Sequence, residues 1–203
     1  MTRPICGIHF EMVILGISCF YHDAAAAILR DGILVAAAEE ERFSRRKHDH
    51  GYPSRAIRFC LKEAGVDSRE LDYVVFYEKP FVKFERIVKT TLQTAPRSLR
   101  LFHNAMGSWL LDKLWIQESI RSDLSVPRDR VLFADHHQSH AASAFYCSPF
   151  EEAAVLTVDG VGEWSCGSIG WGKGNRLHLT HEMRFPIPWD FSTAPSPLSS
   201  DSR

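Results

Sequence analysis

Three of the ten histidines lie within the five-residue stretch His136–His140. If this stretch is helical, His136 and His140 are one turn apart and share a face of the helix. Two imidazoles at that spacing can bind one metal ion, as in other helical sites with two histidine ligands. An ordinary helix with hydrogen-bonded histidines is the alternative. The position after a short apolar strand favours a site, because α/β proteins bind ligands beyond the carboxyl ends of their strands.

A second candidate is the stretch "TVDGVGEW", in which Asp159 follows an apolar run and precedes two glycines. Gly160 and Gly162 can form a tight turn whose backbone amides face an anion. A plain hairpin turn is the alternative, and the motif is weak when taken alone.

Two polar loops near the N-terminus supply further candidates. His22 follows the apolar run of "GISCFYHDAAAAI", and its imidazole could act as a general acid or base. Lys47 is one of four cations in "EEERFSRRKHD", which together could hold a phosphorylated ligand. The alternatives are a loop histidine that its neighbour hydrogen-bonds, and a solvated loop of mixed charge.

The surrounding pattern predicts the elements that position these residues. Strands are expected at 13–18, 24–29 and 33–38, the last two joined by a type I′ turn at Asp31-Gly32. A helix over 53–64, a strand over 72–78 and helices broken at Pro96 follow. A strand then leads into the histidines, and 153–179 reads as three strands joined by turns. This order predicts an α/β protein and matches the ribonuclease-H-like fold of actin-like ATPases.

Composition narrows the class of protein. The formal net charge is −1, which disfavours nucleic acid as an electrostatic partner. No apolar run reaches the roughly 18 residues that a membrane span requires. Five cysteines without a CxxC pair indicate a reducing compartment, so we expect a cytoplasmic protein.

Four stretches together resemble the N-terminal part of the bacterial O-carbamoyltransferases, a family that includes nodulation-factor and antibiotic carbamoyltransferases. The stretches are "GISCFYHDAAAAILRDG", "AAAEEERFSRRKHD", "DHHQSHAASAFYCSPFEEAAVLTVDGVGEW" and "RFP". The resemblance covers roughly Val13 to Pro186. It implies the first lobe of a Kae1-like, actin-like ATPase domain, with a mixed β-sheet and flanking helices, which in the family precedes a YrdC-like domain.

The resemblance also implies a reaction. The YrdC-like domain makes carbamoyl-adenylate from carbamoyl phosphate and ATP, and the first domain transfers the carbamoyl group to a hydroxyl of a small molecule or glycan. The first domain holds a divalent metal ion, with iron expected. His136 and His140 match the family's metal-binding histidines, and the remaining protein ligand is expected to be an aspartate beyond this chain.

The other candidates match positions around the transfer reaction. Asp159, Gly160 and Gly162 match the loop that faces the nucleotide and the carbamoyl group, and His22 and Lys47 match positions beside the transfer site. An inactive truncated gene product, or a relative of the tRNA-threonylcarbamoyl-transfer protein, remains the alternative. Neither nucleic acid nor membrane is expected as a partner.

The resemblance divides the chain into three parts. Residues 1–11 form an N-terminal extension, residues 12–186 form one lobe, and residues 187–203 form a disordered tail. The tail replaces family-like sequence, and a shift of one nucleotide in the reading frame after Pro186 would restore "HSLGLLYSAFT". We therefore expect a frameshift at that point.

Overall fold

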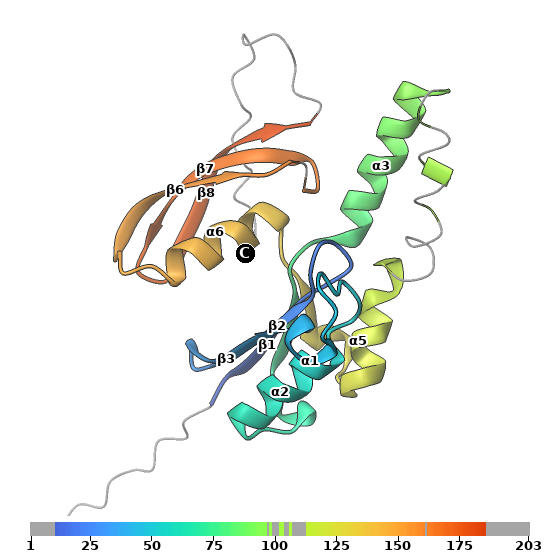
Figure 1. Ribbon diagram of the computed structural model, residues 1–203. Coiled ribbons are helices and arrows are strands. Elements are labelled where there is room, and N and C mark those ends of the chain that lie inside the picture. The colour runs from blue at the N-terminus through green and yellow to red at the C-terminus, as the bar shows by residue number, and fades with distance from the viewer. Residues whose placement is uncertain are drawn as a thin grey trace, which may run out of the picture. The chain divides into compact units, whose positions relative to one another are not determined.

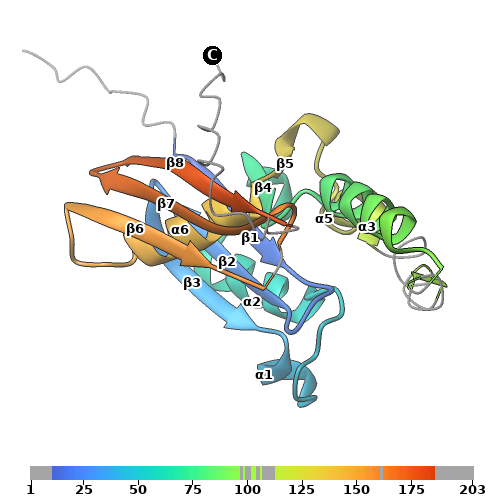
Figure 2. The ribbon, with the colours of Figure 1, turned by 90° about the horizontal axis from the view of Figure 1, so that it is seen from above.

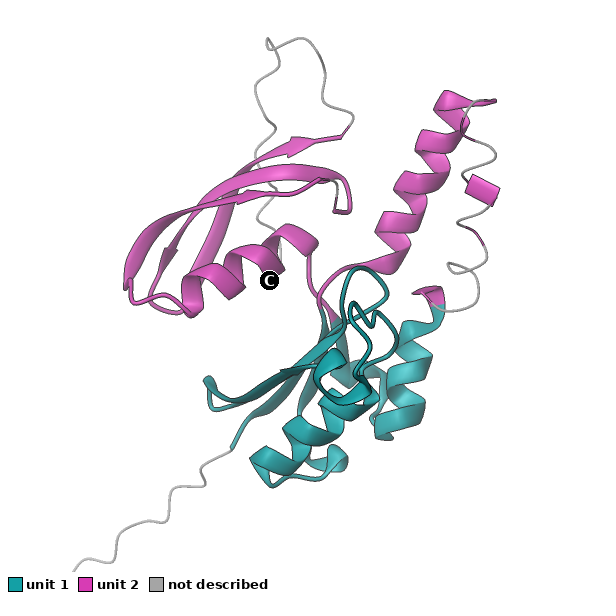
Figure 3. Ribbon diagram, viewed as in Figure 1, with its two compact units in different colours: residues 1–76, 115–132 teal, residues 77–114, 133–203 magenta. Residues whose placement is uncertain are grey.

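A computed structural model describes residues 11–96, 98, 102–103, 106, 113–160 and 162–185. The chain divides into two compact units (Figure 3). Unit 1 comprises Met1–Phe76 and Trp115–Leu132, and unit 2 comprises Tyr77–Leu114 and Phe133–Arg203. Each unit contains one β-sheet. The single lobe expected over residues 12–186 stays a prediction. The expected tail lies outside the described residues, as does the expected extension except for its last residue.

A mixed five-stranded sheet forms the centre of unit 1 (Figure 1). Its order is β3-β2-β1-β4-β5. The strands are β1 (Val13–Ser18), β2 (Ala25–Arg30), β3 (Ile33–Glu39), β4 (Tyr73–Phe76) and β5 (Val131–Phe133). β1 runs antiparallel to β2 and parallel to β4. The α/β class and the mixed sheet are therefore confirmed, and the three leading antiparallel strands are those expected of the ribonuclease-H-like fold.

The turn between β2 and β3 has the conformation that its sequence demands. Asp31 and Gly32 have φ values of 52° and 79°. Both lie in the left-handed region that a type I′ turn needs at its two central residues. The predicted hairpin at Asp31-Gly32 is therefore confirmed.

Short helices cover the sheet of unit 1. These are α1 (Glu41–Ser44), α2 (Ser54–Ala64) and α5 (Ile116–Leu124), with 3₁₀ turns at Ser68–Glu70, Lys113–Trp115 and Arg128–Arg130. The sequence predicts an apolar stripe of Ala56, Ile57, Cys60, Leu61 and Ala64 on α2, and all of these side chains are buried except Leu61, which is half-buried. The Cys60 thiol lies 3.4 Å from the carbonyl oxygen of Ala26 in β2, which ties α2 to the sheet.

Unit 2 contains a three-stranded antiparallel sheet together with helices. The strands β6 (Glu152–Val158), β7 (Ser165–Lys173) and β8 (Arg176–Arg184) pair in that order, as the sequence predicted. The helices include α3 (Pro80–Thr94) and α6 (His136–Tyr146), and α6 lies along one face of the sheet (Figures 1 and 2).

A small apolar cluster fixes α6 on this sheet. Ala141 and Phe145 of α6 pack with Val155 of β6, and Ala153, Leu177 and Leu179 cover the cluster. Burial of these side chains is the main force that holds the helix in place. Because α6 carries the clustered histidines, this packing sets their position over β6 and β7.

No helix within the described ranges is both long and apolar enough to cross a membrane. No disulfide joins the described cysteines, and three of them, Cys19, Cys60 and Cys166, are buried. That burial agrees with the behaviour of cysteine as a small hydrophobic residue.

Candidate metal centre

The histidine helix begins where the sequence predicts it. β5 ends at Phe133 and α6 starts at His136. Asp135 between them has an extended backbone, and its carbonyl oxygen accepts a hydrogen bond from the amide of Ser139 at 2.9 Å. This bond closes the first turn of the helix, so His136 and His140 lie on one face.

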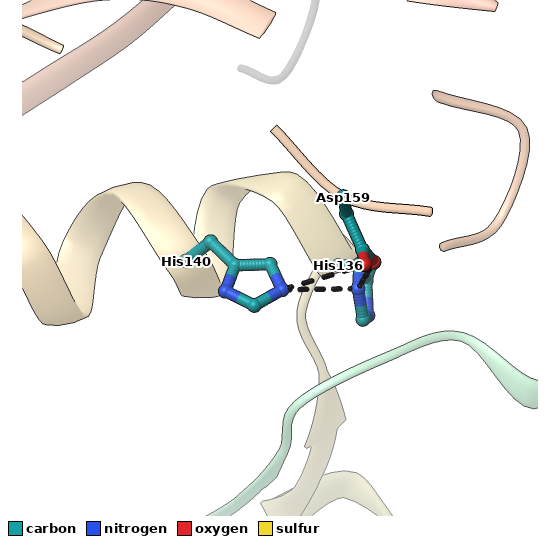
Figure 4. Close-up of side chains that lie close together, drawn as sticks. All are labelled: His136, His140 and Asp159. Carbon is teal, nitrogen blue, oxygen red and sulfur yellow. Dashed lines mark hydrogen bonds and ion pairs between the residues drawn. The ribbon is translucent and has the colours of Figure 1, made fainter. Parts of the chain in front are cut away.

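Three side chains converge at this turn (Figure 4). The Nε2 atoms of His136 and His140 are 3.1 Å apart. The Oδ2 atom of Asp159 lies 2.6 Å from Nε2 of His136 and 3.9 Å from Nε2 of His140. Asp159 follows β6 at the start of the turn to β7, so the helix supplies two potential ligands and the turn supplies the third.

The spacing of the three donor atoms fits a metal ion. In a tetrahedral site with ligand distances of about 2.1 Å, neighbouring donors are about 3.4 Å apart. The three separations of 3.1, 2.6 and 3.9 Å bracket this value. Two imidazole nitrogens and one carboxylate oxygen also form a donor set that suits Zn²⁺ and Fe²⁺. The residues therefore fit the metal ion that the resemblance implies.

The local electrostatics favour the protonation states that bind metal. Burial lowers the pKa of His136 against the opposing hydrogen bond of Asp159, so the ring is neutral at pH 7. Burial alone would raise the pKa of Asp159. Hydrogen bonds from His136 and from the Gly160 amide, together with both imidazoles, nevertheless keep this pKa below its ordinary value. A neutral imidazole and an ionised carboxylate are the forms that coordinate an ion.

The two glycines after Asp159 shape the centre. The amide of Gly160 donates a hydrogen bond to Oδ1 of Asp159 at 2.6 Å, which leaves Oδ2 facing the histidines. Gly162 packs against the ring of His136, where a Cβ atom would lie only 2.3 Å from Cδ2. In the structure the amide of Gly160 thus orients the neighbouring carboxylate, whereas the sequence suggested an amide that faces a bound anion.

His137 points away from this cluster and serves the packing of α6. Its Nδ1 is 2.6 Å from Oγ1 of Thr157, and its Nε2 is 2.9 Å from the carbonyl oxygen of Ser165. The ring is buried and joins α6 to β6 and β7. Both ring nitrogens are therefore engaged, and His137 is not a candidate ligand.

His22 and Lys47 belong to unit 1 and are exposed. The structure joins the two loops that carry them. The amide of Phe20 donates to the carbonyl oxygen of His50 at 2.7 Å, and Nδ1 of His48 lies 3.1 Å from Oδ1 of Asp23. These contacts hold the two loops together, while the roles of His22 and Lys47 stay predictions.

The same loops contain a second, exposed group of potential ligand atoms from Asp23, Glu41 and His48. The carboxylate of Glu41 accepts a hydrogen bond from the amide of His48 at 3.1 Å. Because hydrogen bonds within the loops account for this arrangement, we assign it no ion.

A cavity of about 680 Å³ opens beside the centre within unit 2. Its wall includes His136, Lys79, Asp135, Glu163, Trp164 and Arg184. Oε1 of Glu163 accepts a hydrogen bond from the amide of Lys79, whose ammonium group pairs with Asp135 at 2.7 Å. The centre therefore borders a polar cavity, and its donor atoms are not enclosed by apolar side chains alone.

The sequence did not predict two features of the centre. Asp159 was assigned to the nucleotide and carbamoyl group, and the third ligand was expected beyond the chain, yet its carboxylate meets both imidazoles. Glu78 and Lys83 were not singled out, although Glu78 is buried next to His136 and Lys83 is buried against Glu78. The only signal for them is the charged pattern "YEKPFVK" directly after an apolar strand.

The chain has named relatives of much greater length. It is 52% identical over 180 residues to the uncharacterized protein sll1178 of Synechocystis, with 85% of this chain and 29% of that protein covered. It is 36% identical over 158 residues to the nodulation protein NolNO of Sinorhizobium fredii, with 78% and 22% covered. The chain thus spans less than a third of the length of either relative.

A solved structure of YeaZ from Pseudomonas aeruginosa aligns with 89% of this chain and 72% of its own chain, at 17% identity and a TM-score of 0.45. The family model described as the carbamoyltransferase N-terminus matches residues 13–192, which include both candidate histidines and Asp159. The chain therefore belongs to the carbamoyltransferase N-terminus family.

Proposed function

We propose that this chain is the metal-binding and transfer portion of an O-carbamoyltransferase, which moves a carbamoyl group from carbamoyl-adenylate to a hydroxyl of a small molecule or glycan. The observation that carries the proposal is the convergence of His136, His140 and Asp159 at one point, in a chain of this family. A hydrogen bond between His136 and Asp159 alone could serve packing, so the second imidazole at 3.1 Å is the feature that supports an ion.

His136, His140 and Asp159 would hold the metal ion, and iron is the proposed metal. When bound, such an ion supplies a Lewis acid that can polarise a carbonyl or phosphoryl oxygen. The buried side of the centre, formed by His136, fixes the direction from which substrate can approach. The more exposed His140 and the bordering cavity leave the other side accessible.

His22 and Lys47 are proposed to act on the reacting groups. The acceptor oxygen attacks the carbamoyl carbon, the bond from that carbon to the phosphate oxygen breaks, and AMP leaves. His22 would take the hydroxyl proton, and the ammonium group of Lys47 would stabilise negative charge that develops on the carbonyl oxygen or the leaving phosphate.

The donor is proposed to come from the part of the longer protein that this chain does not span. Carbamoyl phosphate and ATP are the proposed starting compounds, and carbamoyl-adenylate is the proposed intermediate. The acceptor is proposed to be a small molecule or a glycan that carries a free hydroxyl. The proposed partners are therefore carbamoyl phosphate, ATP and a hydroxyl-bearing acceptor, with divalent iron as the bound ion.

The test joins this chain to the C-terminal remainder of the Synechocystis relative, and we call this protein the extended chain. The extended chain is given ATP, radiolabelled carbamoyl phosphate and a panel of oligosaccharides. We expect label in an oligosaccharide and release of AMP, and we expect bound iron by elemental analysis. Replacement of His140 by alanine should abolish both the labelling and the bound metal.

Two results would contradict the proposal. Label transferred only to tRNA would favour a relative of the threonylcarbamoyl-transfer protein. Full transfer activity in a protein without bound metal would show that the reaction does not require the metal centre. His181→Ala serves as the matched control, because His181 is an exposed histidine of unit 2 that hydrogen-bonds Thr180 and does not line the cavity beside the centre.

A further inference from the structure

The second ring nitrogen of His136 is buried in a specific environment. Nδ1 has no hydrogen-bond partner among the described residues, although it is shielded from solvent. A polar atom in that position is costly unless a partner becomes available. The nearest acidic group is the carboxylate of Glu78, whose Oε2 lies 3.6 Å from Nδ1.

Glu78 is itself held in place. Its Oε2 accepts a hydrogen bond from Nζ of Lys83 at 2.6 Å, and both side chains are about as buried as His136, with exposed fractions of 6% for Glu78 and 7% for Lys83. Lys83 lies in the first turn of α3, and Glu78 lies in the segment that leads into this helix. The hydrogen bond from the buried ammonium group of Lys83 therefore fixes the direction of the buried Glu78 carboxylate.

Metal binding by His136 changes what Nδ1 requires. A neutral imidazole has one N–H group and one free nitrogen. When Nε2 is the ligand, the proton must reside on Nδ1, which then needs an acceptor. Histidine ligands commonly donate this second N–H to a carboxylate, which fixes the ring and strengthens its binding to the ion. Oε2 of Glu78 is the carboxylate oxygen placed to accept it.

We propose that Glu78 is a positioning residue of the metal centre, whose carboxylate, held by Lys83, accepts a hydrogen bond from Nδ1–H of His136 when Nε2 binds the ion. The inference rests on the proposed metal site. Closing the present 3.6 Å to a charge-assisted hydrogen bond of about 2.8 Å needs only a small rotation of the imidazole or the carboxylate. Lys83 then holds the acceptor and does not contact the ion.

The test measures the affinity of the 203-residue chain for Zn²⁺, used as a diamagnetic probe, by competition with a chelator. Glu78→Gln keeps an acceptor oxygen but loses the charge, and we expect a loss of affinity of up to about tenfold. The double variant Glu78→Leu/Lys83→Met removes the acceptor without leaving a buried charge unpaired, and we expect a loss of about 100-fold, at the upper end for such partners. Melting of the metal-free variants confirms that they are folded.

Glu85→Gln is the matched control. Glu85 also pairs with a lysine, Lys89, and lies on the same helix as Lys83, but both side chains of this pair are exposed. The affinity of the Glu85→Gln chain for Zn²⁺ should equal that of the unmodified chain. A loss in this control as large as that of Glu78→Gln would overturn the positioning role, because it would show a general effect of charge.

A spectroscopic signature separates positioning from a purely structural role. In ¹⁵N spectra of the Zn²⁺-bound chain, His136 should show a protonated Nδ1 whose proton exchanges slowly with solvent. In the double variant this proton should exchange much faster. Unchanged exchange, or unchanged affinity in both Glu78 variants, would refute the inference.

The experiment also distinguishes this inference from the proposed function. If the unmodified chain binds no Zn²⁺, or if His136→Ala binds it as well as the unmodified chain, the metal site itself is refuted and the positioning role falls with it. If the chain binds Zn²⁺ through His136 but the Glu78 variants bind it with unchanged affinity, only the positioning role is refuted.

Discussion

Gly162 lies against the imidazole of His136, so closely that a Cβ atom on Gly162 would approach Cδ2 of the ring to 2.3 Å. The turn between β6 and β7 therefore forms one wall of the metal centre, in addition to supplying Asp159. The position tolerates no side chain unless the ring or the backbone of the turn moves.

Gly162→Ala should displace the ring of His136 and weaken metal binding by roughly tenfold or more, as loss of ligand support does. Overpacking of this kind also lowers the free energy of unfolding by about 1–3 kcal/mol. Chelator competition and urea unfolding measure the two effects. Gly160→Ala is the control, because a Cβ at Gly160 meets no atom within 4 Å, and equal losses in both variants would contradict the steric explanation.

His22→Ala and Lys47→Ala should each lower carbamoyl transfer by the extended chain by roughly 100-fold or more, the usual scale for a positioned acid–base group. Both side chains are exposed, so the melting temperature and the metal content should not change. Lys62→Ala, which removes an exposed lysine of α2 in the same unit, is the control. If both variants transfer carbamoyl groups at rates within a few-fold of the rate of the unmodified protein, neither side chain takes part in the reaction.

Glu163 should make the stability of the chain depend on pH. Burial raises the pKa of its carboxyl to about 7 from an ordinary 4.5, although the Lys79 amide opposes the shift. The folded chain thus holds a proton that the unfolded chain releases, so the stabilisation is complete below pH 4.5 and is lost as the pH rises through 7.

Glu163→Gln should remove this pH dependence, because the amide side chain stays neutral at every pH. The free energy of unfolding of the two proteins should differ by up to about 3 kcal/mol more at pH 8 than at pH 4.5. Urea unfolding of the metal-free chains across this range measures the difference. Parallel profiles for the two proteins would show that Glu163 keeps an ordinary pKa.

Glu40 should stabilise the N-terminus of α2. Its buried carboxylate accepts hydrogen bonds from the amides of Arg55 at 3.0 Å and Ala56 at 2.8 Å, which have no partner within the helix. Glu40→Ala should lower the free energy of unfolding by about 2 kcal/mol, and Glu40→Gln by less because an acceptor remains. Glu63→Ala, an exposed change in the same helix, should be nearly neutral by thermal melting. If the Glu40 and Glu63 variants melt alike, the carboxylate does not cap α2.

The sequence determined the local parts of the protein. The turn at Asp31-Gly32 follows from residues that tolerate positive φ, and the buried stripe of α2 follows from helical periodicity. The meeting of His136 and His140 follows from their separation by one helical turn. Each of these features depends on interactions between residues close in sequence, so spacing alone predicts it.

Only the tertiary structure decided how the metal centre is completed. Asp159 meets His136 across 23 residues because the packing of Phe145 on Val155 sets α6 against β6, and no periodicity encodes that contact. The same holds for Gly162, which only the folded chain places on the ring, and for Glu78, which comes from another segment of unit 2. Long-range contacts arise from the packing of whole elements, and a single sequence shows only which elements exist.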